Sequence, residues 1–234
     1  MENEKIRFFR SFFYPTLLVL ILWLVKAVEY IFSVNLSEYG LHPLQVKGIP
    51  GIFTSPFLHA DLAHLFANSF PLLILGALLF YFYEEIAWQI LFLLYLVTGI
   101  WVWTFARGHA VHNGASGVIY GLAAFLFFSG IIRRETRLMV ITLLVTFLYG
   151  GLIWGVFPQF FPSKPISWES HMMGLLAGLI LAFYFRKAGP QQKTYEWEEE
   201  EEDGNDEDAE DPEMNQGSEE SGTHPEIRYH PPEH

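Results

Sequence analysis

The chain has 234 residues, a formal net charge of −12 and a hydrophobic fraction of 51%. The charge is unevenly placed: residues 196–234 hold 17 acidic side chains and one basic, whereas residues 1–195 carry a net charge of +4. Several apolar runs of about 20 residues exclude a soluble globular enzyme. The absence of cysteine excludes disulfides, thiolate zinc sites and a Cys nucleophile. The sequence has no dense Lys/Arg face, which excludes a basic nucleic-acid-binding protein.

The apolar runs predict an all-α membrane protein with six membrane-spanning helices. Their expected bounds are about 12–32, 61–83, 86–105, 116–132, 138–157 and 168–186. Six spans place both termini on one side of the membrane. Lys and Arg favour cytoplasmic segments, and with the N-terminus inside, the inner segments hold nine of them and the outer segments three. Cytoplasmic N and C termini are therefore predicted, in what we expect to be a bacterial cytoplasmic membrane.

The sequence divides into three parts. Residues 1–11 are the predicted cytoplasmic N-terminus, and residues 12–187 are the six-span core. Residues 188–234 form an acidic cytoplasmic tail that its composition predicts to be disordered. The longest outer loop, residues 33–60, mixes Leu, Ile and Phe with Gly and Pro, which suits a segment lying in the membrane interface.

Polar side chains inside the spans are costly unless paired or hydrated, so each marks a candidate site. His64 and Asn68 are four residues apart and share one face of the second span. Ser116 opens the fourth span, and His171 lies near the outer end of the sixth. Each alone is typical of helix capping or of hydrogen bonding between membrane helices. Because spans two, four and six all run inward, the four residues are expected at one depth.

Two glycine patterns predict that the fourth and sixth spans pack closely. Gly117-x3-Gly121 and Gly174-x3-Gly178 are spacings that let parallel helices approach. Docking these two seams brings Ser116 and His171 towards each other, which is the arrangement that a Ser nucleophile and a His base require.

The length of the fourth span predicts where Ser116 lies. Its 17 residues extend about 25 Å, less than the ~30 Å hydrocarbon core. If Arg133 and Arg134 fix the inner end, Ser116 is submerged below the outer surface. The preceding loop, residues 106–115, then dips into the membrane beside a water-filled cavity.

Two further groups of polar residues are distinctive. His109 and His112 lie in the outer loop, expected to be wet, where a metal would need a third ligand that the neighbouring sequence lacks. No metal or cofactor is therefore expected.

Lys26 and Glu29 are three residues apart in the first span and can pair on one helix face.

Three motifs, in this order and orientation, resemble the rhomboid family of intramembrane serine proteases. They are His64-x3-Asn68, Gly114-x-Ser116-Gly117 with Tyr120 and Gly121, and His171-x2-Gly174-x3-Gly178. The resemblance covers roughly residues 50–187 and implies a rhomboid-like bundle of six transmembrane helices.

The resemblance also implies a role for each of these residues. Ser116 resembles the nucleophile and His171 the general base. His64 and Asn68 resemble the oxyanion-hole donors, together with the Ser116 backbone N–H. Tyr120 resembles the aromatic residue that packs against the catalytic His. His59 matches a structural His of the family.

The resemblance implies a serine endopeptidase that cleaves transmembrane segments near the outer face, with membrane proteins and the lipid bilayer as its partners. Three alternatives stay open at this point. The chain could be an inactive scaffold that binds membrane helices, or a transporter lined by the same polar residues. The protease could instead use His112 as its base, because His112 is four residues from Ser116.

Overall fold

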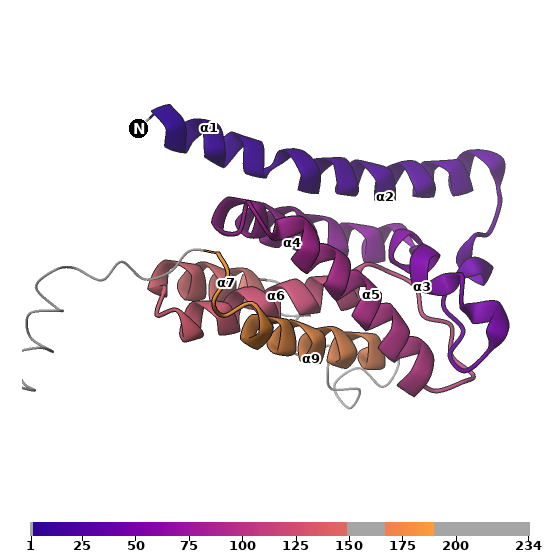
Figure 1. The fold of residues 1–234 in the computed structure, drawn as a ribbon. Helices are drawn as coiled ribbons and strands as arrows, with labels where there is room; N and C mark the ends of the chain where they lie inside the picture. The colour runs from indigo at the N-terminus through magenta and orange to yellow at the C-terminus, as the bar shows by residue number, and fades with distance from the viewer. Residues whose placement is uncertain (1, 149–166, 190–234) are drawn as a thin grey trace, which may run out of the picture. The chain divides into compact units, whose positions relative to one another are not determined.

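The computed structural model describes residues 2–148 and 167–189, and its regular structure there is helical. The long helices are α1 (Glu2–Ser11), α2 (Phe13–Phe32), α4 (Leu62–Phe82), α5 (Ala87–Phe105), α6 (Ser116–Ile132), α7 (Thr136–Leu148) and α9 (Trp168–Tyr184). Four short helices lie between α2 and α4: η1 (Ser37–Tyr39), η2 (Val46–Gly48), α3 (Gly51–Thr54) and η3 (Ser55–Phe57). Figure 1 shows this order from indigo to orange.

Several helices have the length and composition of membrane spans. Within the described residues, three helices are long and apolar enough to cross a membrane: Glu4–Phe32, Leu62–Phe82 and Ala87–Phe105. Two shorter helices are also apolar, Ser116–Ile132 and Thr136–Phe147. The chain is a multi-pass membrane protein. The 29 residues Glu4–Phe32 extend about 43 Å, beyond the ~30 Å hydrocarbon core, so part of this helix lies outside it.

The predicted spans coincide with helices of the structure. The fourth span begins and ends with α6, and the first, second, third and sixth spans lie within two residues of α2, α4, α5 and α9. The N-terminal segment, predicted only as cytoplasmic, forms α1. The second half of the fifth span, from residue 149, and the tail from residue 190 lie outside the described residues.

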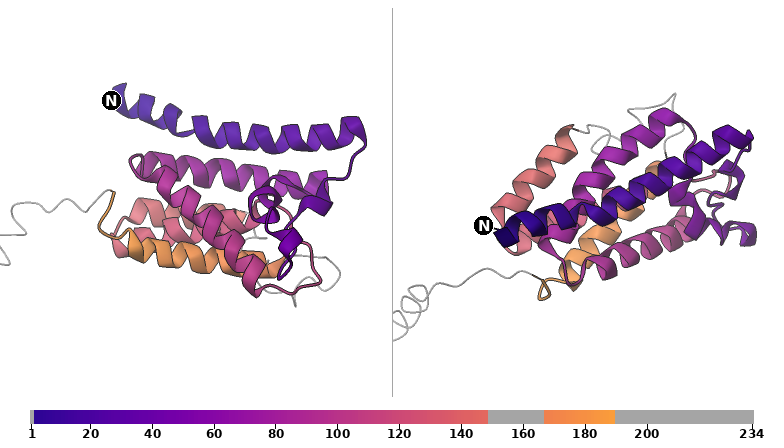
Figure 2. Two further views of the ribbon diagram at one scale, coloured as in Figure 1. Left: turned by 45° about the vertical axis from the view of Figure 1, so that its right-hand side comes forward. Right: turned by 90° about the horizontal axis from the view of Figure 1, so that it is seen from above.

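Helix α6 is the core element of the bundle. It packs against α4, α5, α7 and α9, as the views in Figures 1 and 2 show. Twelve of its 17 residues are buried, and Leu122, Phe125 and Leu126 are fully enclosed. By contrast, α2 exposes much of its apolar surface, which suits contact with lipid because apolar side chains need no cover there.

The glycine seams of α6 and α9 face each other at backbone contact. A Cβ atom on Gly174 would overlap the Gly117 carbonyl oxygen, and one on Gly178 would overlap the Gly121 carbonyl oxygen. Only glycine permits this separation, since any side chain would push the two backbones apart. The seam begins beside Ser116 and so fixes the distance between the first turns of the two helices.

Arg133 clamps the opposite end of the same helix pair. This side chain, expected at the inner end of the fourth span, is only 7% exposed. Its guanidinium donates to the Phe185 carbonyl oxygen at 2.6 Å and also to the Ala188 carbonyl oxygen. It lies over the Tyr83 ring, with 5.3 Å from Cζ to the ring centroid. These contacts join the end of α6 to the segment that follows α9.

Candidate active site

Ser116 and His171 meet at the ends of α6 and α9. Ser116 is the first residue of α6, and His171 lies in the first turn of α9. The distance from His171 Nε2 to Ser116 Oγ is 2.9 Å, and each residue is 8% exposed. When the imidazole carries its proton on Nδ1, the Ser116 hydroxyl donates to Nε2. This is the hydrogen bond through which a base activates a serine nucleophile.

The Tyr120 ring supports the imidazole from one side. Tyr120 lies one turn after Ser116 in α6, and its ring stacks on His171 with centroids 4.2 Å apart and an interplanar angle of 10°. Tyr120 is itself buried, at 4% exposure. A stacked ring limits rotation of the imidazole about its side-chain bonds. The contact with Tyr120 can therefore fix the orientation of the imidazole, a task that a carboxylate performs in a Ser-His-Asp triad.

His64 and Asn68 cover the turn that precedes Ser116. Gly114 has a φ of +111°, where L side chains are strained, and a Cβ there would lie 2.7 Å from His64 Nε2 and 3.4 Å from Asn68 Nδ2. Gly114 N donates to the Ser55 carbonyl oxygen at 2.9 Å, which fixes the turn. Glycine therefore allows two side-chain donor groups of α4 to approach the backbone just before Ser116.

The Asn68 amide is an unusual buried donor. Asn68 is 5% exposed, and its Nδ2 has no hydrogen-bond partner among the residues that the structure describes. A buried N–H without a partner costs roughly 1–3 kcal/mol, so such groups are rare unless a ligand uses them. The amide is thus available to an anionic oxygen beside Ser116.

His59 packs beneath His64 in the segment before α4. It is 1% exposed, and its ring meets that of His64 edge to face, with centroids 5.1 Å apart. Burial, together with the neighbouring His64, lowers the pKa of His59 to about 4. His59 is therefore neutral at physiological pH and acts as a packing residue under His64.

The prediction that His112 lies in a wet loop is wrong. His112 is 4% exposed because its backbone pairs with Leu41, with N···O distances of 2.9 and 3.0 Å. Its Nδ1 is hydrogen-bonded to Ser167 Oγ, and burial lowers its pKa. These contacts direct the imidazole to the start of α9, so the geometry does not favour His112 as the base. The described residues hold no cluster of three His, Cys, Asp or Glu suited to a metal.

An ion pair that the sequence reasoning missed joins the same loop to α9. Arg107 Nε is hydrogen-bonded to Glu169 Oε1, and its guanidinium lies 5.7 Å from the Trp168 ring centroid. This carboxylate raises the pKa of Arg107. Glu169 is 4% exposed and lies two residues before His171. The available signal was an acidic residue in the first turn of an apolar helix, a position that the helix dipole favours.

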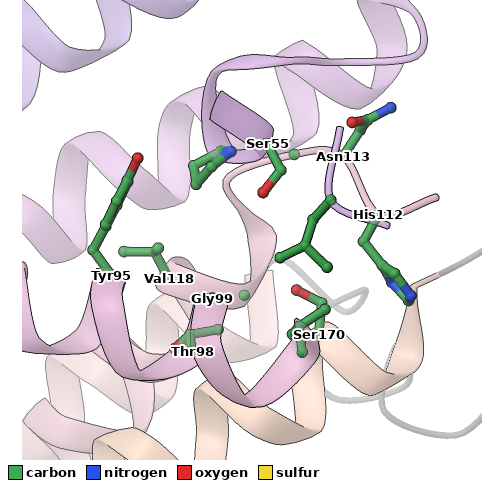
Figure 3. A pocket seen from close by; sticks show the side chains of 13 residues that line it. Ser55, Tyr95, Thr98, Gly99, His112, Asn113, Val118 and Ser170 are labelled. Carbon is green, nitrogen blue, oxygen red and sulfur yellow. The ribbon is translucent and has the colours of Figure 1, made fainter. Parts of the chain in front are cut away.

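A small polar cavity adjoins the turn around Gly114 and Gly117. Its volume is about 20 Å³, room for about one water molecule. Thr98 and Asn113 line it with buried oxygens that have no hydrogen-bond partner in the described part of the chain. Figure 3 shows the Ser170 side chain at its wall, on the first turn of α9. The cavity therefore places polar groups next to the first turn of α6.

Comparison with known proteins shows the family of the chain. Residues 47–188 match the family model described as the rhomboid domain. An uncharacterized protein of Mycobacterium tuberculosis is 33% identical over 188 residues, covering 75% of each chain. One of Mycobacterium leprae is 30% identical over 187 residues, 74% of this chain and 70% of its own. Rhomboid-like protein 11, chloroplastic, of Arabidopsis thaliana is 27% identical over 192 residues, 69% of this chain and 66% of its own. The chain therefore belongs to the rhomboid family.

Proposed function

We propose that the protein is an intramembrane serine endopeptidase that uses Ser116 as nucleophile and His171 as general base. The observation that carries this proposal is the 2.9 Å contact between Ser116 Oγ and His171 Nε2. The imidazole is stacked on Tyr120, and the buried Asn68 amide lies beside the same turn. Nucleophile, base, orienting group and oxyanion donor thus lie within one cluster, as acyl transfer requires.

The reaction proceeds in two halves. Ser116 Oγ bonds to the substrate carbonyl carbon while its proton passes to His171 Nε2, and the carbonyl oxygen becomes an oxyanion. The peptide C–N bond then breaks, and His171 returns the proton to the leaving amine. A water molecule attacks the resulting ester, and His171 moves its proton to Ser116 Oγ as the acid product leaves.

Three donors are assigned to the oxyanion. They are the His64 ring, the Asn68 Nδ2 amide and the Ser116 backbone N–H. The Ser116 N–H lies at the N-terminus of α6, where the helix dipole also favours negative charge. Each donor aimed at an oxyanion typically contributes 10²–10³ in rate.

The proposed substrates are transmembrane segments of other membrane proteins. In this topology, residues 12–187 form a six-span core, both termini and the acidic tail 188–234 are cytoplasmic, and the site opens near the outer face. The homologues from mycobacteria favour a bacterial cytoplasmic membrane. A substrate helix must unwind before its carbonyl reaches Ser116, because a helical carbonyl is hydrogen-bonded within its own chain.

An inactive protein that binds membrane helices is the second candidate. It would share the fold and the contact surfaces but lack turnover, and the mycobacterial relatives carry no assigned activity. A transporter is less favoured. The polar residues of the candidate site gather at one end of the bundle, and the Thr142 and Thr146 hydroxyls of α7 donate to carbonyls of their own helix at 2.7 Å.

Purified protein in detergent tests the proposal with a single-pass membrane substrate and a fluorophosphonate probe that labels activated serines. We expect cleavage and labelling by the wild type, and loss of both in Ser116→Ala. His171→Ala should lose at least 10²-fold, because general-base catalysis contributes that much. His112→Ala should retain cleavage. Cleavage by Ser116→Ala, or neither cleavage nor labelling by the wild type, contradicts the proposal.

A further inference from the structure

Lys26 of α2 reaches the segment that leads into α4. Its Nζ donates to the His59 carbonyl oxygen at 2.8 Å, to the Ala60 carbonyl oxygen at 3.3 Å and to Glu29 Oε2 at 2.9 Å. An ammonium group has three N–H donors, and all three have acceptors here. The Lys26 side chain is 18% exposed. Two of the three bonds thus hold a backbone segment more than 30 residues away in the sequence.

Glu29 completes the arrangement and is equally satisfied. Its side chain is 7% exposed, with Oε2 accepting from Lys26 and Oε1 accepting from the Leu36 backbone N–H at 2.9 Å. The pair therefore joins α2 to the segments on both sides of the outer loop 33–60. A charged pair in an apolar helix is tolerated when every donor and acceptor is used, as here.

The segment that Lys26 holds controls the first turn of α4. His59 and Ala60 directly precede Asp61, the N-cap residue, whose Oδ1 accepts from the His64 backbone N–H at 2.7 Å. His64 is one of the two α4 side chains that cover Gly114. A displacement of residues 59–60 therefore displaces an assigned oxyanion donor through three residues of continuous backbone.

A second contact between α2 and α4 lies one turn further along. Trp23 Nε1 donates to Ser69 Oγ at 3.0 Å, and the Trp23 ring meets Phe66 edge to face, with centroids 4.6 Å apart. Ser69 is the neighbour of Asn68, the other assigned donor. Helix α2 thus holds α4 next to each of the two donor side chains, as the adjacent helices in Figure 1 illustrate.

We propose that Lys26 and Glu29 are positioning residues of the reaction, which hold His64 at the oxyanion through residues 59–61. This inference rests on the proposed function. Helix α2 lies before residue 47, where the match to the rhomboid domain begins, so the proposal extends the active site to a helix outside the matched region. Stability alone does not call for the pair, because apolar residues of similar volume usually stabilise a buried position as well as an ion pair does.

The test measures cleavage by the full chain after the fraction of active protein has been determined with the fluorophosphonate probe. Displacing a reacting group by about 1 Å costs on the order of 10²-fold in rate. We therefore expect Lys26→Met to lower kcat by about 10–100-fold, with KM within about threefold of wild type. Leu24→Met is the matched control, because Leu24 lies on the exposed face of the same helix and should leave kcat unchanged.

Two further variants separate positioning from a general loss of folding. Lys26→Met/Glu29→Leu removes both charges, so a defect caused only by an unpaired Glu29 would disappear, whereas a positioning defect would persist. Lys26→Met should also add little to His64→Ala, because both changes act on the same donor and coupled effects are not additive.

The possible outcomes distinguish this inference from the proposed function. Recovery of kcat in the double-charge variant overturns positioning, and so does full additivity with His64→Ala. Wild-type kcat in Lys26→Met also overturns it but leaves a Ser116-dependent protease in place. A wild-type protein without cleavage or labelling overturns both proposals.

Discussion

Replacing Gly174 by Ala should separate the two helices that hold Ser116 and His171. The added Cβ would overlap the Gly117 carbonyl oxygen and lie 2.8 Å from the Gly117 carbonyl carbon. Ordinary van der Waals contact begins near 3.4 Å, so the backbones must part by about 0.6 Å at the carbon and by more at the oxygen. We take about 1 Å as the resulting displacement, since neither backbone can rotate away as a side chain can.

That displacement is large compared with the tolerance of the dyad. The Ser116–His171 distance of 2.9 Å would lengthen to roughly 3.5–4 Å, beyond hydrogen-bond range. We expect kcat/KM to fall by about 10²-fold and the free energy of unfolding by about 1–3 kcal/mol. Cleavage by probe-titrated protein measures the first, and thermal unfolding in detergent measures the second.

Gly121→Ala is the matched control on the same seam. Its Cβ would meet Leu94 Cδ2 at 2.8 Å, the movable end of a side chain, while the nearest backbone atom, the Gly174 carbonyl oxygen, is 3.2 Å away. This variant should keep kcat/KM within about tenfold of wild type, because the helices need to move only a few tenths of an ångström. Equal activity of Gly174→Ala and wild type would refute the reasoning that backbone contact sets the dyad geometry.

Two further predictions concern stability. Because the His59 pKa is about 4 in the folded chain and about 6.5 when unfolded, the unfolded state binds more protons between these values, and stability decreases as the pH falls from 6.5 towards 4. Thermal unfolding should show that the free energy of unfolding is about 2 kcal/mol lower at pH 5 than at pH 8. His59→Phe should remove this difference, and an unchanged pH profile in that variant would contradict the assignment. Glu169→Gln should lower the free energy of unfolding by about 1–2 kcal/mol. If the two side chains act as a pair, adding Arg107→Gln should lower it little more, whereas additive losses would argue against pairing.

The sequence predicted much of the fold because its signals are local. Apolar runs place the helices, and the bounds expected for the fourth span are those of α6. The glycine spacing likewise predicted which helices dock, since Gly117 and Gly174 lie at backbone contact. The depth expected for each span predicted that Ser116 and His171 lie at the same end of the bundle. In the structure, Ser116 Oγ and His171 Nε2 are 2.9 Å apart.

The sequence reasoning placed His112 poorly because its environment comes from distant residues. Its position in a short loop suggested water, whereas pairing with Leu41, 71 residues earlier, buries it. Loop composition gave no sign of that pairing. The Arg107–Glu169 pair was overlooked for the same reason, since its members are separated by 62 residues and belong to different elements.

By itself, the sequence determined a helical membrane protein, the family motifs and the pairing of Lys26 with Glu29, because periodicity, apolar length and i,i+3 spacing are properties of a continuous stretch. Only the tertiary structure decided what those groups contact. It brought the Lys26 ammonium to the His59 and Ala60 carbonyls, and the Asn68 amide to Gly114. Such contacts depend on how helices pack across intervals of more than 30 residues, and no local pattern specifies that packing.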